Sequence, residues 1–134
     1  MAQKIEPLFG LQVLNHIALS AGHGSGFYEE YETREVFTDK NYLYDVATWI
    51  DGHSMETVYQ DREVALIREG SFDYDGAVYA VVWNKQLYIK KIYLEENGFR
   101  LVSINKNYRD KLASVEYEPR IAGKIVGNFM PMEQ

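Results

Sequence analysis

The sequence predicts a mainly β fold, in which short antiparallel strands form a single compact domain. The chain has 134 residues, 46% of them hydrophobic, which suits one domain with one core. Its 11 tyrosines and 6 phenylalanines favour strands over helices. In the second half of the chain, turn signals recur about every 8 to 12 residues, as they do in β-sandwiches and barrels.

The predicted strands follow one another as a meander. His16 lies in a predicted N-terminal strand, and a later segment mixes aromatic and acidic residues in FYEEYETREVF. After these, short apolar runs are separated by the turn sequences DYDG, NK and ENG, which are typical of hairpin connections. These strands are predicted at residues 62–70, 77–83, 86–94, 99–105 and 120–130.

Two segments depart from the strand pattern. Residues 19–27, LSAGHGSGF, carry three glycines and two serines, so they predict a flexible loop. Residues 54–59, SMETVY, predict a short helical turn. We therefore divide the chain into an N-terminal arm with this loop, 1–26, and a main domain, 27–134.

Composition excludes several classes of function. The net charge is −6 and no Lys/Arg cluster is present, so this chain alone is not expected to bind nucleic acid. It has no cysteine, and neither a signal sequence nor a membrane-spanning run, which indicates a cytoplasmic protein. The spacing of its three histidines predicts no metal site, and no cofactor motif is present.

Ser54, in the segment IDGHSMETVY, is a candidate nucleophile. Its neighbour His53 is badly placed as a base, because adjacent side chains diverge from a turn. A triad would need His16 or His23 to fold back, which we do not expect. Serine in such a segment also caps turns in many proteins, so a purely structural role stays open.

A lysine amine is the other group that activates serine. Lys90 and Lys91 lie inside the apolar strand QLYIKKIYL, so one of them points toward a buried face. Burial lowers the pKa of lysine and makes it a proton acceptor, whereas a lysine that extends to water has only a structural role. Alternation alone does not choose between Lys90 and Lys91.

Five short motifs, in order, resemble the self-cleaving serine peptidase domain of LexA, lambda-type phage repressors and UmuD. They are SAGHG, DGHSM, DREVALI, DGAVYAVVWNKQLYIKKI and SINKNY, and the resemblance extends from about residue 10 to residue 129. It implies a LexA-like β fold with Ser54 as nucleophile and Lys90 as general base. It also implies that the scissile bond is Ala21-Gly22.

A mechanism follows from these roles. Neutral Lys90 takes the Ser54 proton, Ser54 attacks the Ala21 carbonyl, and the backbone N–H groups of His53 and Ser54 stabilise the oxyanion. Because only neutral lysine is a base, self-cleavage is expected to accelerate as the pH rises from 7 toward 10.

The sequence departs from the family pattern at three places. This chain has His53 where the family often has Asp or Met. It has Thr57 where the family often has Pro, and Arg62-Glu63 where the family often has Gly-Asp. We expect these differences to alter the turn that precedes VALI.

The resemblance implies the C-terminal dimerisation and autoproteolysis domain of a phage or SOS-type repressor. Such a domain forms a homodimer, has a RecA filament as a candidate co-protease, and reaches operator DNA only through a separate N-terminal helix-turn-helix domain. The alternatives are a UmuD-like mutagenesis accessory protein and a non-catalytic dimerisation module of the same fold.

Overall fold

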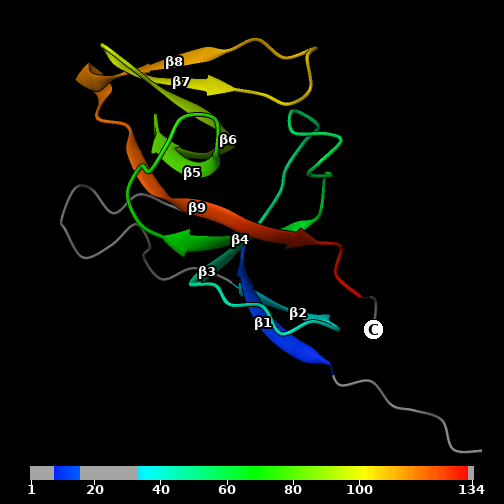
Figure 1. Cartoon of the computed structure of the whole chain (residues 1–134). Helices are drawn as coiled ribbons and strands as arrows, with labels where there is room; N and C mark the ends of the chain where they lie inside the picture. Colours follow the sequence, from blue (N-terminus) through cyan, green and yellow to red (C-terminus); the bar gives the residue numbers. More distant parts are fainter. Residues whose placement is uncertain (1–7, 16–32, 133–134) are drawn as a thin grey trace, which may run out of the picture.

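The computed structural model describes residues 8–15 and 33–132, which form one nine-stranded sheet (Figure 1). Within the described residues the only helical element is the short 3-10 helix η1 (Val115–Tyr117). The predicted mainly β fold is confirmed. The strands are β1 (Phe9–Leu14), β2 (Thr33–Thr38), β3 (Val46–Trp49), β4 (Val64–Glu69), β5 (Val78–Trp83), β6 (Gln86–Glu95), β7 (Gly98–Val102), β8 (Lys111–Ser114) and β9 (Arg120–Phe129).

The predicted hairpins of the second half are confirmed. β5 and β6 pair antiparallel, and the two residues between them, Asn84 and Lys85, both have positive φ, as a two-residue hairpin turn requires. β6 and β7 are joined by the predicted ENG turn. There Gly98 has φ +151, and a Cβ at this position would lie 2.1 Å from the carbonyl oxygen of Ala113. Only glycine fits this approach of β8.

The meander prediction is wrong for the last strand. β5 to β8 do follow one another, but β9 returns to lie between β4 and β5 and is hydrogen-bonded to both (Figure 1). Its pairing with β4 is long-range, so the local turn signals that predict hairpins carry no information on it. Register shifts opposite Leu66/Ile67 and Ala80/Val81 interrupt both ladders.

Two strands were not predicted from the sequence. β3 has only four residues, and β8 is a short edge strand with exposed Lys111 and Leu112, so neither carries a clear apolar alternation. β1 lies within the predicted N-terminal arm and pairs antiparallel with β2 over six residues and parallel with β3 at Leu14. Its Leu11 and Val13 are buried.

The segment after Ser54 forms successive hydrogen-bonded turns. The Tyr59 N–H donates to the Met55 carbonyl at 2.9 Å, which closes one helix-like turn, but no regular helix continues from it. The predicted helical turn is thus a single turn in an irregular loop.

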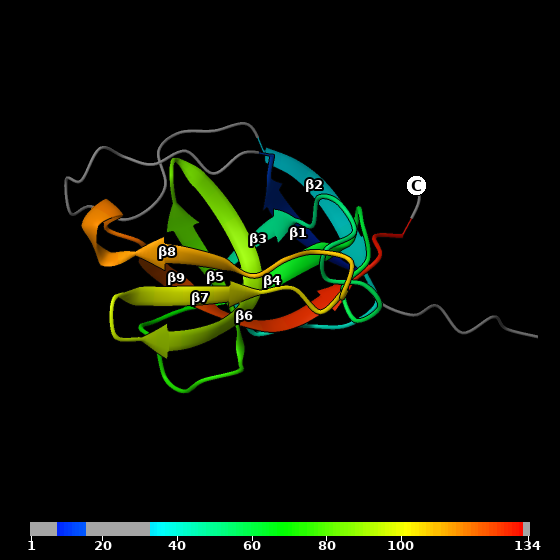
Figure 2. The same ribbon diagram turned by 90° about the horizontal axis from the view of Figure 1, so that it is seen from above.

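Apolar side chains cluster in three groups along the sheet. One lies at the β1–β4 end, one under the centre, and one at the β5–β8 end; Figure 2 shows these two ends on opposite sides of the molecule. The fully buried Tyr79, Ile92 and Leu101 belong to the third cluster, beside the lysine pair of β6. Among residues 8–15 and 33–132, no helix is long and apolar enough to cross a membrane.

Candidate functional site

Ser54 lies in the loop of residues 50–63, between β3 and β4. The loop is closed at its base by two backbone hydrogen bonds of 2.8 Å, from Ile50 N–H to the Glu63 carbonyl and from Arg62 N–H to the Ile50 carbonyl. Inside the loop, the Gly52 N–H donates to Asp61 Oδ1 at 2.7 Å. The next residue after the serine, Met55, is buried. These contacts fix the backbone on both sides of Ser54.

A second segment of the chain holds the same loop. Asn105, in the β7–β8 connection, donates its backbone N–H to the Ser54 carbonyl at 2.9 Å and its side-chain amide to the His53 carbonyl at 3.0 Å. In Figure 1 this connection, coloured yellow to orange, runs beside the loop that precedes β4. The serine is therefore held between two loops that are far apart in sequence.

Lys90, on β6, faces Ser54. Its Nζ donates a hydrogen bond to Ser54 Oγ. Lys91 is the next residue along the strand, so its side chain points to the opposite face of the sheet. The structure thus brings together the predicted serine and the first lysine of the pair.

The surroundings of Lys90 disfavour its charged form. Burial, and to a smaller extent the positive charge of Lys111 on β8, lowers the pKa of Lys90 to about 8. In the part of the chain that the structure describes, no carboxylate lies within ion-pair distance of its Nζ. A substantial fraction of this lysine is therefore neutral near physiological pH.

This lowered pKa also affects stability. The pKa is 10.5 in the unfolded chain and about 8 in the folded one, so between these values the unfolded chain binds more protons. Stability therefore rises with pH across that window, and below pH 8 the charged ammonium destabilises the fold. A buried lysine that lowers the stability of the fold in this way indicates a functional role.

The histidines and the predicted cleavage bond are apart from this pair. His53 has an exposed side chain that pairs with Glu56, whose hydrogen bond and charge raise the pKa of the imidazole. His16 and His23, as well as Ala21 and Gly22, lie outside the described residues. Within residues 8–15 and 33–132, no group of three or more metal-ligating side chains occurs.

A cleft of about 530 Å³ lies beside Ser54 and Lys90. One wall is formed by β3 and the start of the loop, and the other by the β5–β6 turn and residues 86–90 of β6. β7 pairs with β6 only from Lys91 onward, so among the described strands none covers the edge of residues 86–90 on that side. With respect to the described strands, the cleft therefore has an open backbone edge, and an extended peptide can bind to such an edge as an added strand.

Asn15 also lines this cleft. Its side-chain oxygen accepts a 3.2 Å hydrogen bond from Trp49 Nε1. It is the last described residue before the segment that contains Ala21-Gly22. The chain thus enters that segment at the wall of the cleft.

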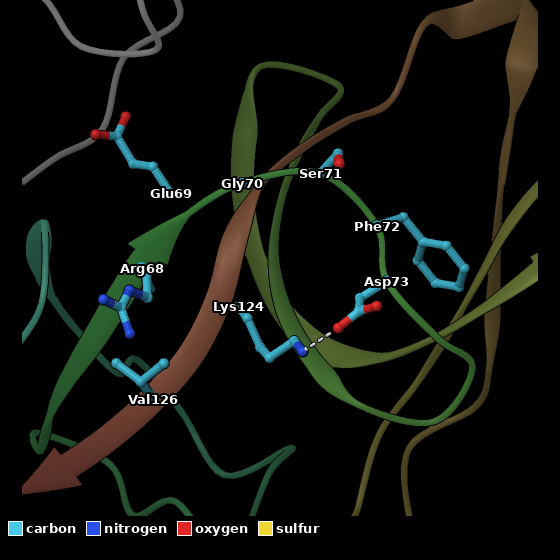
Figure 3. A pocket seen from close by; sticks show the side chains of 8 residues that line it. All are labelled: Arg68, Glu69, Gly70, Ser71, Phe72, Asp73, Lys124 and Val126. Carbon is cyan, nitrogen blue, oxygen red and sulfur yellow. Dashed lines mark hydrogen bonds and ion pairs between the residues drawn. The ribbon is translucent and has the colours of Figure 1, made fainter.

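A second hollow, of about 260 Å³, shares no residue with the first. Figure 3 shows Lys124 extending from β9 to Asp73, with Arg68 and Val126 beside it. The Lys124–Asp73 ion pair measures 2.8 Å and raises the pKa of Lys124. Its ammonium holds its proton, so this hollow contains no comparable base.

That the departures from the family pattern alter the turn before VALI stays a prediction; the backbone of this turn has one unusual residue. Arg62 has φ +72, a left-handed conformation that glycine adopts freely and other residues adopt at a cost of about 1 kcal/mol. The loop thus adopts a glycine-type conformation here although arginine occupies the position, and its closing hydrogen bonds are present.

Two contacts of the site were not predicted from the sequence. Asn105 lies in the quoted motif SINKNY, where a polar residue just after a strand was the available signal. Lys111 lies on the unpredicted strand β8, so no local signal linked it to Lys90.

Fold and cleft together define a class: mainly β domains in which a serine and a lysine meet beside a groove that fits an extended peptide. The chain belongs to the Peptidase S24-like family, whose model matches residues 12–126. This family includes the C-terminal domains of LexA and phage repressors and UmuD; its members are in general serine peptidases and commonly dimerise. No curated protein matches the chain.

Proposed function

We propose that this chain is a self-cleaving serine peptidase domain of a phage or SOS-type repressor, which cuts its own Ala21-Gly22 bond with Ser54 and Lys90. The observation that carries the proposal is the hydrogen bond from Lys90 Nζ to Ser54 Oγ, made by a half-buried lysine whose pKa is lowered to about 8. A lysine used only for solubility would extend to water and pair with a carboxylate.

The reaction begins with proton transfer. Neutral Lys90 accepts the Ser54 hydroxyl proton as the oxygen attacks the Ala21 carbonyl carbon. When the C–N bond to Gly22 breaks, the Lys90 ammonium donates that proton to the leaving amine. Water, deprotonated by Lys90, then hydrolyses the Ala21 ester and regenerates Ser54.

The negative charge that develops on the Ala21 oxygen needs hydrogen-bond donors. We assign this role to the backbone N–H groups of His53 and Ser54, which make no hydrogen bond to any other described residue. Donors fixed before the reaction stabilise the transition state without reorganisation.

Delivery of the scissile bond in cis is supported by Asn15. Ala21 lies six positions after Asn15, and six extended residues span about 20 Å. Since Asn15 lines the cleft that contains Ser54, the predicted bond is within reach of the nucleophile without any rearrangement of the sheet.

Intact-mass analysis of the incubated protein tests this function. We expect two fragments that correspond to a cut after Ala21 in the wild type, and none in Ser54→Ala. Ser71→Ala, a serine in the second hollow, serves as the matched control and should cleave at the wild-type rate. Cleavage at another bond, or cleavage of Ser54→Ala, would contradict the proposal.

We also propose that the domain forms a homodimer, to which β9 contributes. β9 pairs with β4 from Gly123 to Phe129 but with β5 only from Arg120 to Lys124. The exposed apolar side chains of this segment are Val126 and, just beyond the strand, Met130. Sedimentation should show a dimer that Val126→Glu weakens. A monomer at high micromolar concentration would contradict this.

A further inference from the structure

We propose that Asn105 is the positioning residue of the peptidase site, whose side-chain amide fixes the direction of the Ser54 N–H by holding the His53 carbonyl. The inference rests on the proposed function, because it assigns to Asn105 the alignment of the oxyanion donor next to the nucleophile. The described hydrogen bonds of Asn105 go to the backbone of His53 and Ser54, whereas Ser54 Oγ is bound by Lys90.

The geometry of the peptide bond carries the argument. The His53 carbonyl and the Ser54 N–H belong to one planar trans peptide unit, so they point in opposite directions. Asn105 Nδ2 binds this carbonyl at 3.0 Å from one side. The Ser54 N–H is consequently aimed to the other side of the peptide unit.

A second contact of the same residue fixes the next peptide unit. The backbone N–H of Asn105 donates to the Ser54 carbonyl at 2.9 Å. Asn105 therefore holds the carbonyls on both sides of the Ser54 Cα, from which the side chain extends to Lys90. Rotation of either unit would displace Oγ.

Asn105 is itself held in place. Its side-chain oxygen accepts the Asn107 N–H at 3.0 Å, and the Tyr108 N–H donates to its carbonyl at 3.1 Å. The first contact orients the amide group, so that the nitrogen and not the oxygen faces His53. A carboxylate at this position would present an acceptor to the His53 carbonyl and repel it.

The chain offers a matched control in Asn128. Its side-chain amide also donates to a carbonyl of the 50–63 loop, that of Val58, at 3.1 Å. The same amide also donates to Glu63 Oε1 at 3.0 Å, so Asn128→Ala removes two side-chain hydrogen bonds to this loop and Asn105→Ala removes one. Only Asn105 binds next to the serine.

The test compares pH–rate profiles of self-cleavage for the wild type and three variants: Asn105→Ala, Asn105→Asp and Asn128→Ala. We expect the plateau rate of Asn105→Ala to fall about 10- to 100-fold, because it misaligns an oxyanion donor, while the midpoint of the profile stays unchanged. The plateau rate of Asn105→Asp, in which the new side chain has nearly the same shape, should fall at least as far. Asn128→Ala should stay within about twofold of the wild type at a similar loss of stability.

Labelling of Ser54 by a small fluorophosphonate gives a readout that does not depend on delivery of the scissile bond. The labelling rates of the Asn105 variants should fall in parallel with their rates of self-cleavage. Equal rates for Asn105→Ala and the wild type, or equal losses in both alanine variants, would overturn the inference alone. A wild type that neither cleaves nor labels would overturn the proposed function and this inference with it.

Discussion

Lys90 and Lys124 flank the same buried residue but differ in their chemistry. Both lie opposite Tyr79 of β5, one from β6 and one from β9. Lys124 is paired with Asp73 and lies 4.5 Å from the centre of the Tyr74 ring, and its pKa is raised. Lys90 is half-buried and faces a hydroxyl, and its pKa is lowered to about 8.

The difference shows that burial without a carboxylate partner, and not the position opposite Tyr79, makes a lysine a base. A carboxylate stabilises the ammonium, whereas burial without a carboxylate destabilises it. Lys111 adds a like charge near Lys90. The Nζ of Lys111 lies 5.3 Å from the centre of the Tyr88 ring. The cleft combines burial, a like charge and a hydroxyl, and the second hollow lacks this combination.

The largest difference between the two lysines is expected when each is replaced by alanine. Lys90→Ala should lower the rate of self-cleavage by about 10²- to 10⁴-fold, the usual contribution of a general base. Lys124→Ala and Lys91→Ala should cleave at nearly the wild-type rate, as measured by intact mass over time. Cleavage that depends on Lys124 or Lys91 instead would refute the assignment of the base.

A smaller effect is expected from the like charge. Lys111→Met removes a cation near Lys90, so the pKa of Lys90 should rise and the neutral fraction at pH 7 should fall. We expect the rate at pH 7 to drop about two- to fivefold and the plateau at high pH to be unchanged, since a partly screened charge acts only on the titration.

Lys106→Met, an exposed lysine in the neighbouring β7–β8 connection, is the matched control. A plateau lowered in Lys111→Met, with no shift of the midpoint, would mean that Lys111 acts on the structure and not on the charge of Lys90.

The smallest effect is expected at the second hollow. Asp73→Asn removes the carboxylate partner of Lys124, so the pKa of that lysine should fall toward its ordinary value, as seen by NMR titration. Stability should change little, as for other exposed ion pairs. The rate of self-cleavage should not change, and a clear loss of rate would show that the two lysine sites are coupled.

Local patterns predicted the elements whose partners lie close in sequence. The strands from β5 to β7 were predicted because their turns and apolar runs are adjacent, and the Asn84-Lys85 connection was predicted with them. β9 was assigned to the wrong place because its pairing with β4 joins segments about 60 residues apart, for which no local signal exists. β3 and β8 were too short to show a period.

The candidate site shows the same limit. Alternation in QLYIKKIYL did not distinguish Lys90 from Lys91; the family resemblance did, and the contact with Ser54 agrees with it. The roles of Lys111 and Asn105 depend on how β8 and the β7–β8 connection pack against the site. Such contacts between distant segments follow from the fold and not from any single motif.

The most direct test of the central claim is the rate of self-cleavage of the wild type between pH 6 and 10, measured by intact mass. With a pKa of about 8 for Lys90, the rate should rise about tenfold per pH unit below 7 and level off above 9. All fragments should end at Ala21 or begin at Gly22. A rate that is independent of pH, or that continues to rise tenfold per unit through pH 10, would contradict a base with the lowered pKa of Lys90.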